Sequence, residues 1–421
     1  MHSFGEYLRP LRVALLVAAA VVPWAPQSRA QTTPLACSTD FQIVQSLTSN
    51  GAKWEMCWDF TPYEGLVLRD IYFTAPGAER RKIMAKLSIG QIFVVYDKGS
   101  PRFEDVSDYG LAGADPSVST LLSMSSSDCP GGSATISYMG KNRVCKRVDK
   151  NIEHAYRWYD TTTNTNLTKQ SSALVLYSMS KVGRYIYKPK WEFVDDGSIK
   201  PSMGATGRLQ EYTTDARYGW LVNDTTEPYG ASHIHNYYWR LHFGIKAASD
   251  ANVVEQIEFK DSGSDKREIV GPTAIPNESA RDVDPLQFRF WRVTNPAFKN
   301  GDGHVISYEI VPESSSIYRG PAAEPWTLHD LWVTENHLCE RTASNNKRVD
   351  RPPLGAGSVC GDNVADYINP AEVITDPVVW YKVSFHHVPR DEDETNMLTE
   401  SVGFKLQPRD MTRLNPWEKK P

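Results

Sequence analysis

A His-x-His pair, His233 and His235, is the pattern in this sequence that most directly indicates metal chemistry. It lies in the run Ser232–Leu241, which is rich in aromatic residues and has the character of a β-strand. Side chains two residues apart on a strand point to the same face, so both imidazoles can reach one ion. Two surface or hydrogen-bonded histidines would give the same pattern. A catalytic metal centre needs at least one further ligand.

The third ligand is best sought in Val383–Asp393, a hydrophobic run that ends in His386 and His387 and continues into a turn with one proline and several acidic residues. A histidine at the end of a strand can complete the pair if sheet packing brings the two strands side by side. His386 and His387 are therefore the candidates for the third ligand.

The elements that must position these histidines have mainly β character. Short runs alternate apolar and polar residues and are broken by Gly, Pro, Asn and Asp, which predicts a large β-sandwich with few helices. Residues 78–87 form the best helical candidate by propensity, although tertiary context can override propensity. The sequence shows no repeat and no long linker. The clearest strand candidates are Gly65–Phe73, Gln91–Tyr96, Gln287–Val293 and Val378–Phe385.

The N-terminus predicts export from the cytoplasm. Arginines precede an apolar stretch that is too short to span a bilayer, and Ser28, Arg29 and Ala30 resemble a cleavage site. Residues 1–30 are thus predicted to be a signal peptide cleaved near Ala30, and residues 31–421 a single domain, secreted or periplasmic and not membrane-bound. A net charge of −5 argues against a nucleic-acid partner.

The six cysteines fall into three pairs of neighbours along the chain. Disulfides persist outside the cytoplasm, and none of the pairs has the C-x-x-C spacing of a structural zinc site. We predict the bridges Cys37–Cys57, Cys129–Cys145 and Cys339–Cys360, although six cysteines permit fifteen connectivities.

Taken together, several motifs resemble the copper-containing amine oxidases. The His-x-His strand continues as Tyr-Tyr-Trp-Arg-Leu, and His387 opens a His-x-Pro-Arg-x-Glu-Asp motif. The resemblance covers roughly Trp54 to Pro416. It implies the catalytic domain alone, without the small domains that usually precede it, and a homodimer. Further matching segments are Phe60–Leu68, Asp105–Leu111, His329–Thr334 and Val402–Leu406.

The resemblance implies a role for each candidate site residue. His233, His235 and His387 would hold Cu²⁺, and Tyr185 would be the precursor of the quinone cofactor topaquinone. Asp105 would be the base that takes a proton from the substrate carbon. Tyr96 resembles the tyrosine that hydrogen-bonds the quinone, but it lies closer to Asp105 in the sequence than the family pattern predicts.

Each of these residues also has a plain structural interpretation. Tyr185 could be a half-buried strand tyrosine beside Tyr187, and Asp105 could be one acid of a polar turn. Moreover, Arg184 and Ile186 stand where the family has Asn and Asp or Glu next to the quinone precursor.

The implied function is the copper- and topaquinone-dependent oxidation of a primary amine by O₂ to aldehyde, ammonia and hydrogen peroxide. Because Arg184 and Ile186 depart from the family pattern, the alternative is a copper-binding β-sandwich that lacks the quinone. A third possibility is a secreted β-sandwich without catalytic activity, serving in adhesion or as an accessory subunit.

Overall fold

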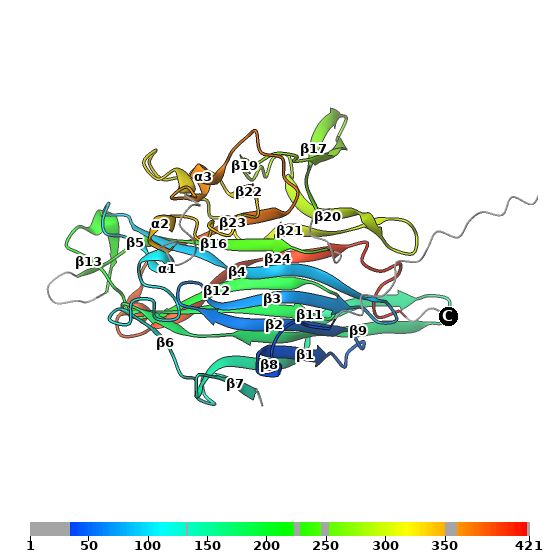
Figure 1. Cartoon of the computed structure of the whole chain (residues 1–421), viewed down its shortest axis with the longest axis horizontal. Helices are drawn as coiled ribbons and strands as arrows, with labels where there is room; N and C mark the ends of the chain where they lie inside the picture. Colours follow the sequence, from blue (N-terminus) through cyan, green and yellow to red (C-terminus); the bar gives the residue numbers. More distant parts are fainter. Residues whose placement is uncertain (1–33, 132–133, 223–227, 246–251, 350–359, 419–421) are drawn as a thin grey trace, which may run out of the picture.

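The computed structural model describes residues 34–131, 134–222, 228–245, 252–349 and 360–418. Two features of the sequence lie outside these residues: the predicted signal peptide, and Pro352-Pro353, a pair of prolines that predicts a turn. Within them the chain is mainly β, with two large antiparallel sheets and a few short helices, as the alternation of apolar and polar residues predicts. The prediction of a large β-sandwich with few helices is confirmed (Figure 1).

The first sheet carries the His-x-His strand near its centre. Its order is β1-β2-β3-β4-β16-β23-β22-β19, with β5 paired to β4. Its strands are β1 (Gln42–Ser46), β2 (Lys53–Thr61), β3 (Gly65–Thr74), β4 (Arg80–Tyr96), β5 (Arg102–Glu104), β16 (His233–Phe243), β19 (Ser279–Arg281), β22 (Leu331–Glu335) and β23 (Pro377–His387).

The second sheet carries Tyr185 at the start of β11. Its order is β18-β17-β20-β21-β24-β12-β11-β9-β8-β7, and β10 joins β11 to β6. Its strands are β6 (Ser119–Leu121), β7 (Ala134–Tyr138), β8 (Lys141–Asp160), β9 (Thr165–Tyr177), β10 (Ser180–Val182), β11 (Tyr185–Val194), β12 (Ile199–Gly207), β17 (Val253–Gly263), β18 (Lys266–Ala274), β20 (Phe290–Lys299), β21 (Val305–Pro312) and β24 (Met397–Arg409).

The remaining elements are short. None of the helices in the described residues is long and apolar enough to cross a membrane. They comprise a small sheet of β13 (Tyr212–Thr213), β14 (Gly219–Leu221) and β15 (Tyr229–Ala231), the helices α1 (Asp105–Asp108), α2 (Asn346–Val349) and α3 (Val364–Tyr367), and the 3-10 turns η1 (Thr39–Phe41), η2 (Ala216–Tyr218), η4 (Pro325–Thr327) and η5 (Asp391–Asp393).

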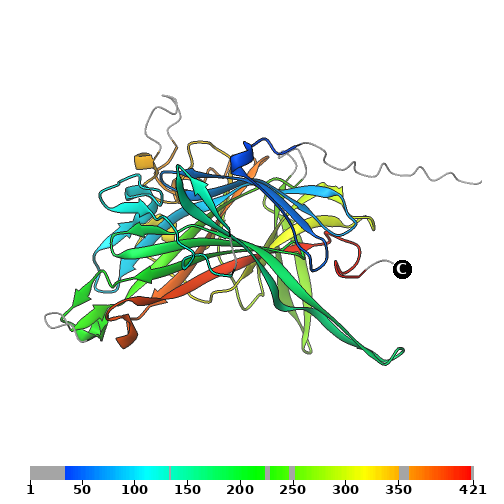
Figure 2. The same ribbon diagram turned by 90° about the horizontal axis from the view of Figure 1, so that it is seen from below.

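The core lies between the inner faces of the two large sheets and is rich in aromatic side chains. Trp191 of β11 and Trp239 of β16 meet edge to face with their ring centroids 5.9 Å apart, and both are fully buried. Burying such a side chain stabilises the fold by roughly 1.5–3 kcal/mol. The same packing of β11 against β16 brings Tyr185 to the His-x-His pair, with the ring centroids of Tyr185 and His233 5.8 Å apart. Figure 2 shows the layered strands of the body from below.

The helical candidate is wrong. Residues 80–87 belong to β4, which pairs with β3 on one side and β16 on the other. A central strand satisfies its backbone groups through both neighbours, and this tertiary pairing outweighs the helix propensity of Ala, Glu and Lys. Three strand candidates are confirmed in β3, β4 and β23. The fourth holds only from Phe290, because Gln287–Arg289 precede β20 in a turn.

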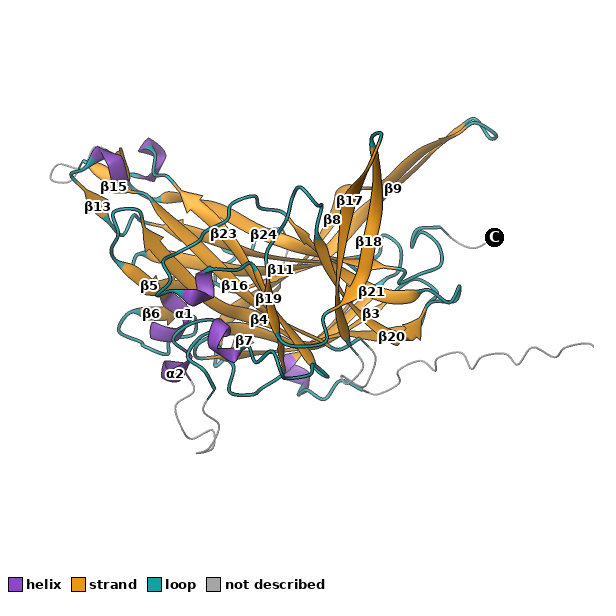
Figure 3. Ribbon diagram, turned by 90° about the horizontal axis from the view of Figure 1, so that it is seen from above, coloured by secondary structure: helices purple, strands orange, loops and turns teal. Residues whose placement is uncertain are grey.

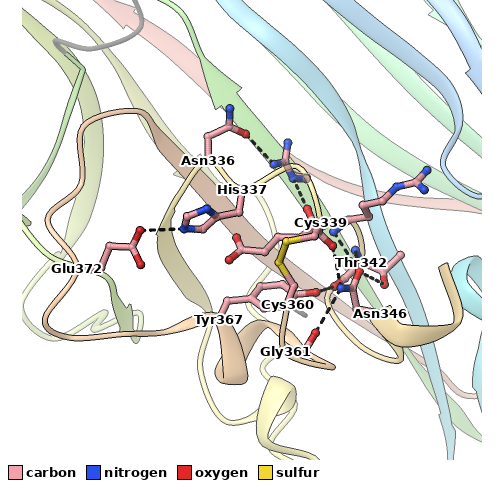
Figure 4. The surroundings of a disulfide bond; sticks show 12 residues. Asn336, His337, Cys339, Thr342, Asn346, Cys360, Gly361, Tyr367 and Glu372 are labelled. Carbon is pink, nitrogen blue, oxygen red and sulfur yellow. Dashed lines mark hydrogen bonds and ion pairs between the residues drawn. A yellow bond between two sulfur atoms is a disulfide. The ribbon is translucent and has the colours of Figure 1, made fainter. Parts of the chain in front are cut away.

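All three predicted disulfides are present: Cys37–Cys57, Cys129–Cys145 and Cys339–Cys360. The third ties the loop after β22 to the segment that leads into α3 (Figure 4). Beside it, His337 Nε2 lies 2.8 Å from Glu372 Oε1.

Two hairpins extend from the body on the same side, β8–β9 and β17–β18 (Figure 3). The outer part of the first is exposed and carries Trp158, Tyr159 and Leu167, while the second carries exposed Ile269. Apolar side chains exposed on such arms are typical of interaction surfaces.

Candidate metal and tyrosine site

Strand pairing brings the three candidate histidines together. In the antiparallel pair of β16 and β23, His233 lies directly opposite His387, so two ligands separated widely in sequence become cross-strand neighbours. On its other side, β16 pairs with β4 and sets His233 opposite Tyr96. The two-residue period of β16 adds His235 on the same face.

The nitrogens of His233 and His387 are spaced as two ligands of one metal ion, and the ring of His235 lies beside them. His387 Nδ1 lies 3.3 Å from His233 Nε2, and the ring centroids of His233 and His235 are 4.9 Å apart. Two nitrogens each about 2.0 Å from one ion at a tetrahedral angle would lie about 3.3 Å apart. His235 Nδ1 is buried and has no hydrogen-bonding partner in the structure. Three imidazoles form a donor set suited to Cu²⁺.

Burial keeps the first two imidazoles in the neutral form that binds metal. Burial, together with the neighbouring His387, lowers the pKa of His233 to about 3. Burial also lowers the pKa of His235 well below its usual value. At neutral pH neither ring carries a proton that a metal would have to displace.

Outer contacts orient the rings. His233 Nδ1 donates to the Ala231 carbonyl at 2.9 Å, which leaves Nε2 free to face the site. His387 Nε2 lies 3.1 Å from the carboxylate of Asp393, whose side chain is 1% exposed. Such partners fix the ring orientation and the tautomer of a metal-binding histidine.

Replacing Asp393 by asparagine is therefore expected to weaken copper binding by about 10–100-fold. The amide keeps the shape of the carboxylate but removes the charge that holds the His387 ring in its orientation. Equilibrium titration of the metal-free protein with Cu²⁺ measures the effect. Asp391→Asn is the matched control, since Asp391 is exposed in the same turn. Equal copper affinity in the two variants would contradict this role for Asp393.

The hydroxyl of Tyr185 points at the histidines. The hydroxyl oxygen lies 2.7 Å from His233 Nε2, and the ring centroids of Tyr185 and His235 are 5.2 Å apart. Burial raises the pKa of Tyr185 well above its usual value, with Tyr96 adding to the effect. A bound cation would act in the opposite direction and favour the phenolate.

The backbone at Tyr185 needs a glycine on the neighbouring strand. Gly207 has a φ of +113°, and a Cβ at this position would lie 2.4 Å from the Arg184 carbonyl oxygen. Any other residue would therefore push β11 away from β12 at the point where Tyr185 is held.

Tyr96 lies on the other side of the same group. It is buried, its ring centroid is 4.8 Å from that of His233, and it lines the same cavity as Tyr185. The structure thus places Tyr96 within reach of Tyr185, although its distance along the chain from Asp105 departs from the family pattern.

Asp105 is the first residue of α1, and its side chain contacts a buried tyrosine of the site. It is 6% exposed, and its Oδ2 accepts a 2.6 Å hydrogen bond from the Tyr187 hydroxyl. Burial raises the pKa of Asp105 to about 7, while the bond from Tyr187 lowers it in part. A carboxylate with this pKa can accept a proton near neutral pH.

The two residues that depart from the family pattern lie away from the histidines. Strand alternation turns Ile186 to the face opposite Tyr185, and Arg184 lies in the exposed turn before β11. The Arg184 guanidinium donates to the Leu209 carbonyl at 3.2 Å, and Ile186 pairs with Thr206 on β12. The cation is held by a neutral carbonyl and does not enter the tyrosine cluster.

Two contacts of the site were not predicted. Tyr187 had no assigned role, although its position two residues after Tyr185 on a strand places it on the same face. Asp393 is one of several acids after His387, and only the conformation of turn η5 distinguishes it, by bringing its carboxylate to His387.

A second group of potential metal ligands also was not predicted. Glu278, His337 and Glu372 have potential ligand atoms within 4.8 Å of one another, and these residues are too far apart in the sequence to form a recognisable motif.

The sequence matches a described family over most of its length. Residues 50–421 match the family "Copper amine oxidase, enzyme domain". A primary amine oxidase of Arthrobacter sp. (strain P1) is 26% identical over 393 residues, which cover 87% of this chain and 59% of that protein. A histamine oxidase of Arthrobacter globiformis is 27% identical over 409 residues, with 87% and 56% covered. The chain thus spans less than two thirds of these curated relatives.

Solved structures show the same fold. A copper-containing benzylamine oxidase from Hansenula polymorpha superposes with a TM-score of 0.70 at 18% identity, covering 93% of this chain and 64% of that one. An amine oxidase from Aspergillus nidulans gives a TM-score of 0.69 at 21% identity, covering 94% and 56%. The chain is therefore a distant member of the copper amine oxidase family and belongs to it through its enzyme domain.

Proposed function

We propose that this protein oxidises a primary amine with O₂ to an aldehyde, ammonia and hydrogen peroxide, using copper and a quinone made from Tyr185. One observation carries the proposal: the Tyr185 hydroxyl lies 2.7 Å from His233 Nε2, within a cluster of three histidines. A tyrosine held at this distance from a metal site is positioned for oxidation there. Family membership supports the same chemistry.

Copper would supply the oxidation of the Tyr185 ring by O₂, and the quinone would supply the electron sink for the amine. The residues of this chain would carry out the proton transfer and hold the reacting groups in position. Asp105 takes the proton from the substrate carbon, Tyr187 holds the Asp105 carboxylate in place, and Tyr96 restrains the Tyr185 ring. Asp105 and Tyr185 line one small cavity, so the proposed base and the proposed quinone face the same space.

The bond from Tyr187 gives a testable pH dependence. Burial raises the pKa of Asp105 to about 7, so kcat/KM should rise with pH through about 7 as the carboxylate forms. Tyr187→Phe removes a hydrogen bond to the charged form, which raises the pKa further and moves the acid limb to higher pH. The profile of kcat/KM between about pH 5 and about pH 9 measures this. An unmoved acid limb would rule out the assignment.

The second candidate function is copper binding without the quinone. It is favoured by Arg184 and Ile186, which replace the residues that flank the quinone precursor in the family. In that case Tyr185 would remain a phenol beside the metal.

Product analysis tests the proposal against this alternative. The copper-loaded protein is supplied with a primary amine, and O₂ uptake, hydrogen peroxide and aldehyde are measured together. The proposal predicts the three in equal amounts, all dependent on copper. Copper binding without amine-dependent O₂ uptake would favour the second candidate.

We also propose that residues 31–421 form one secreted or periplasmic unit after removal of residues 1–30. The three disulfides support this location. The assembly we propose is a homodimer, supported by the exposed Trp158 and Ile269 on the two extended hairpins.

A further inference from the structure

A small cavity lies between Asp105 and Tyr185. Its volume is about 130 Å³, and it is formed by residues of both large sheets together with α1 and its neighbouring loops. The lining includes Phe103, Asp105, Tyr109, Val182, Tyr185 and Gln210.

The lining carries a single carboxylate. Apart from Asp105 the described residues around the cavity are apolar, phenolic or, in the case of Gln210, an amide. The cavity therefore offers one anionic partner to a cationic ligand.

We propose that the substrate is a primary monoamine whose amine-bearing carbon carries an apolar group no larger than a phenyl ring, and that diamines and polyamines are rejected. This inference rests on the proposed amine oxidation. The volume sets the upper limit, because an apolar cavity of about 150 Å³ accommodates benzene. Val118 and Val182, with the rings of Phe103 and Tyr109, supply the apolar walls.

The second positive charge of diamines and polyamines excludes them from this cavity. One ammonium group of a short diamine would be placed beside Asp105, and the described residues that line the rest of the cavity offer no counter-charge to the other. A buried ammonium with no anionic partner is strongly disfavoured relative to water. A site with unpaired buried charges discriminates far more than a site that only loses an apolar contact.

The first test compares substrates on the copper-loaded protein. We expect kcat/KM for benzylamine and isobutylamine to exceed that for the diamine putrescine by at least about 100-fold. Equal values for benzylamine and putrescine would overturn the inference while leaving amine oxidation intact.

The second test adds to the cavity the second negative charge that its lining lacks. Gln210→Glu keeps the shape of the side chain, and its Oε1 can still accept the 3.2 Å bond from the Arg184 amide. The variant should raise kcat/KM for putrescine relative to benzylamine by about tenfold or more. Gln287→Glu is the matched control, because it adds the same charge at an exposed turn outside the cavity. No change in the ratio with Gln210→Glu, or the same change with both variants, would contradict the inference.

A binding measurement separates the two levels of the account. The copper-free protein keeps Tyr185 as the phenol, and calorimetry then gives dissociation constants for benzylamine and putrescine without turnover. Benzylamine should bind at least about tenfold more tightly. If the copper-loaded protein reacts with no carbonyl reagent, amine oxidation fails as the function, and these constants still decide the cavity's preference. Tighter binding of putrescine would overturn it.

Discussion

Replacing Asp105 by asparagine is expected to lower kcat/KM for a primary amine by about 10²–10⁴-fold, the usual contribution of a general base. The side chain is buried at the start of α1, and burial raises the pKa of its carboxyl to about 7. An amide of the same shape can still accept the bond from the Tyr187 hydroxyl, but it cannot take a proton from the substrate carbon. Steady-state kinetics with a primary amine measure the loss.

The same variant should keep its copper and its quinone, because Asp105 does not contact the three histidines in the structure. Titration with phenylhydrazine counts the quinone in the wild-type protein and in Asp105→Asn. Asp108→Asn is a control for charge in the same helix, since Asp108 is half-buried and faces Asn345 and Arg348. Full turnover by Asp105→Asn would show that the base is another residue.

The second large effect is expected for Tyr185→Phe, which should abolish both the quinone and amine turnover while copper still binds. The phenol oxygen is the atom that faces His233 at 2.7 Å, and without it the ring has no group to be oxidised at this position. The three histidines remain, so copper affinity should stay within about tenfold of the wild type. Visible absorbance after copper loading in air and metal titration measure the two quantities.

Tyr187→Phe is the matched control, because the two rings are nearly parallel with their centroids 5.9 Å apart. The hydroxyl of Tyr187 is bonded to Asp105 rather than to a histidine, so this variant should keep the quinone. If Tyr187→Phe lost the visible band and Tyr185→Phe kept it, the precursor would be the other tyrosine.

The fold was predictable where local pattern and burial agree. Alternation in residues 65–73 and 378–385 identifies β3 and β23, and chain proximity identifies the three disulfides. Residues 80–87 were misassigned, because their propensity favours a helix while their pairing with β3 and β16 is set by residues distant in the sequence. Local preference cannot report a tertiary pairing of this kind.

Part of the candidate site was likewise predictable from the sequence, and part was not. The strand period alone places His233 and His235 on one face. In contrast, the cross-strand register of His233 with His387 depends on how the whole sheet assembles. The bond from Tyr187 to Asp105 and the contact of Asp393 with His387 depend on side-chain packing, so the residue types could not single them out.

The most direct measurement of the central claim is the visible spectrum of the metal-free protein after addition of copper in air, recorded before and after phenylhydrazine. The three histidines and the adjacent Tyr185 predict that a visible band develops with copper and shifts when the hydrazine reacts with the quinone carbonyl. Bound copper without such a band or adduct would contradict quinone formation at Tyr185.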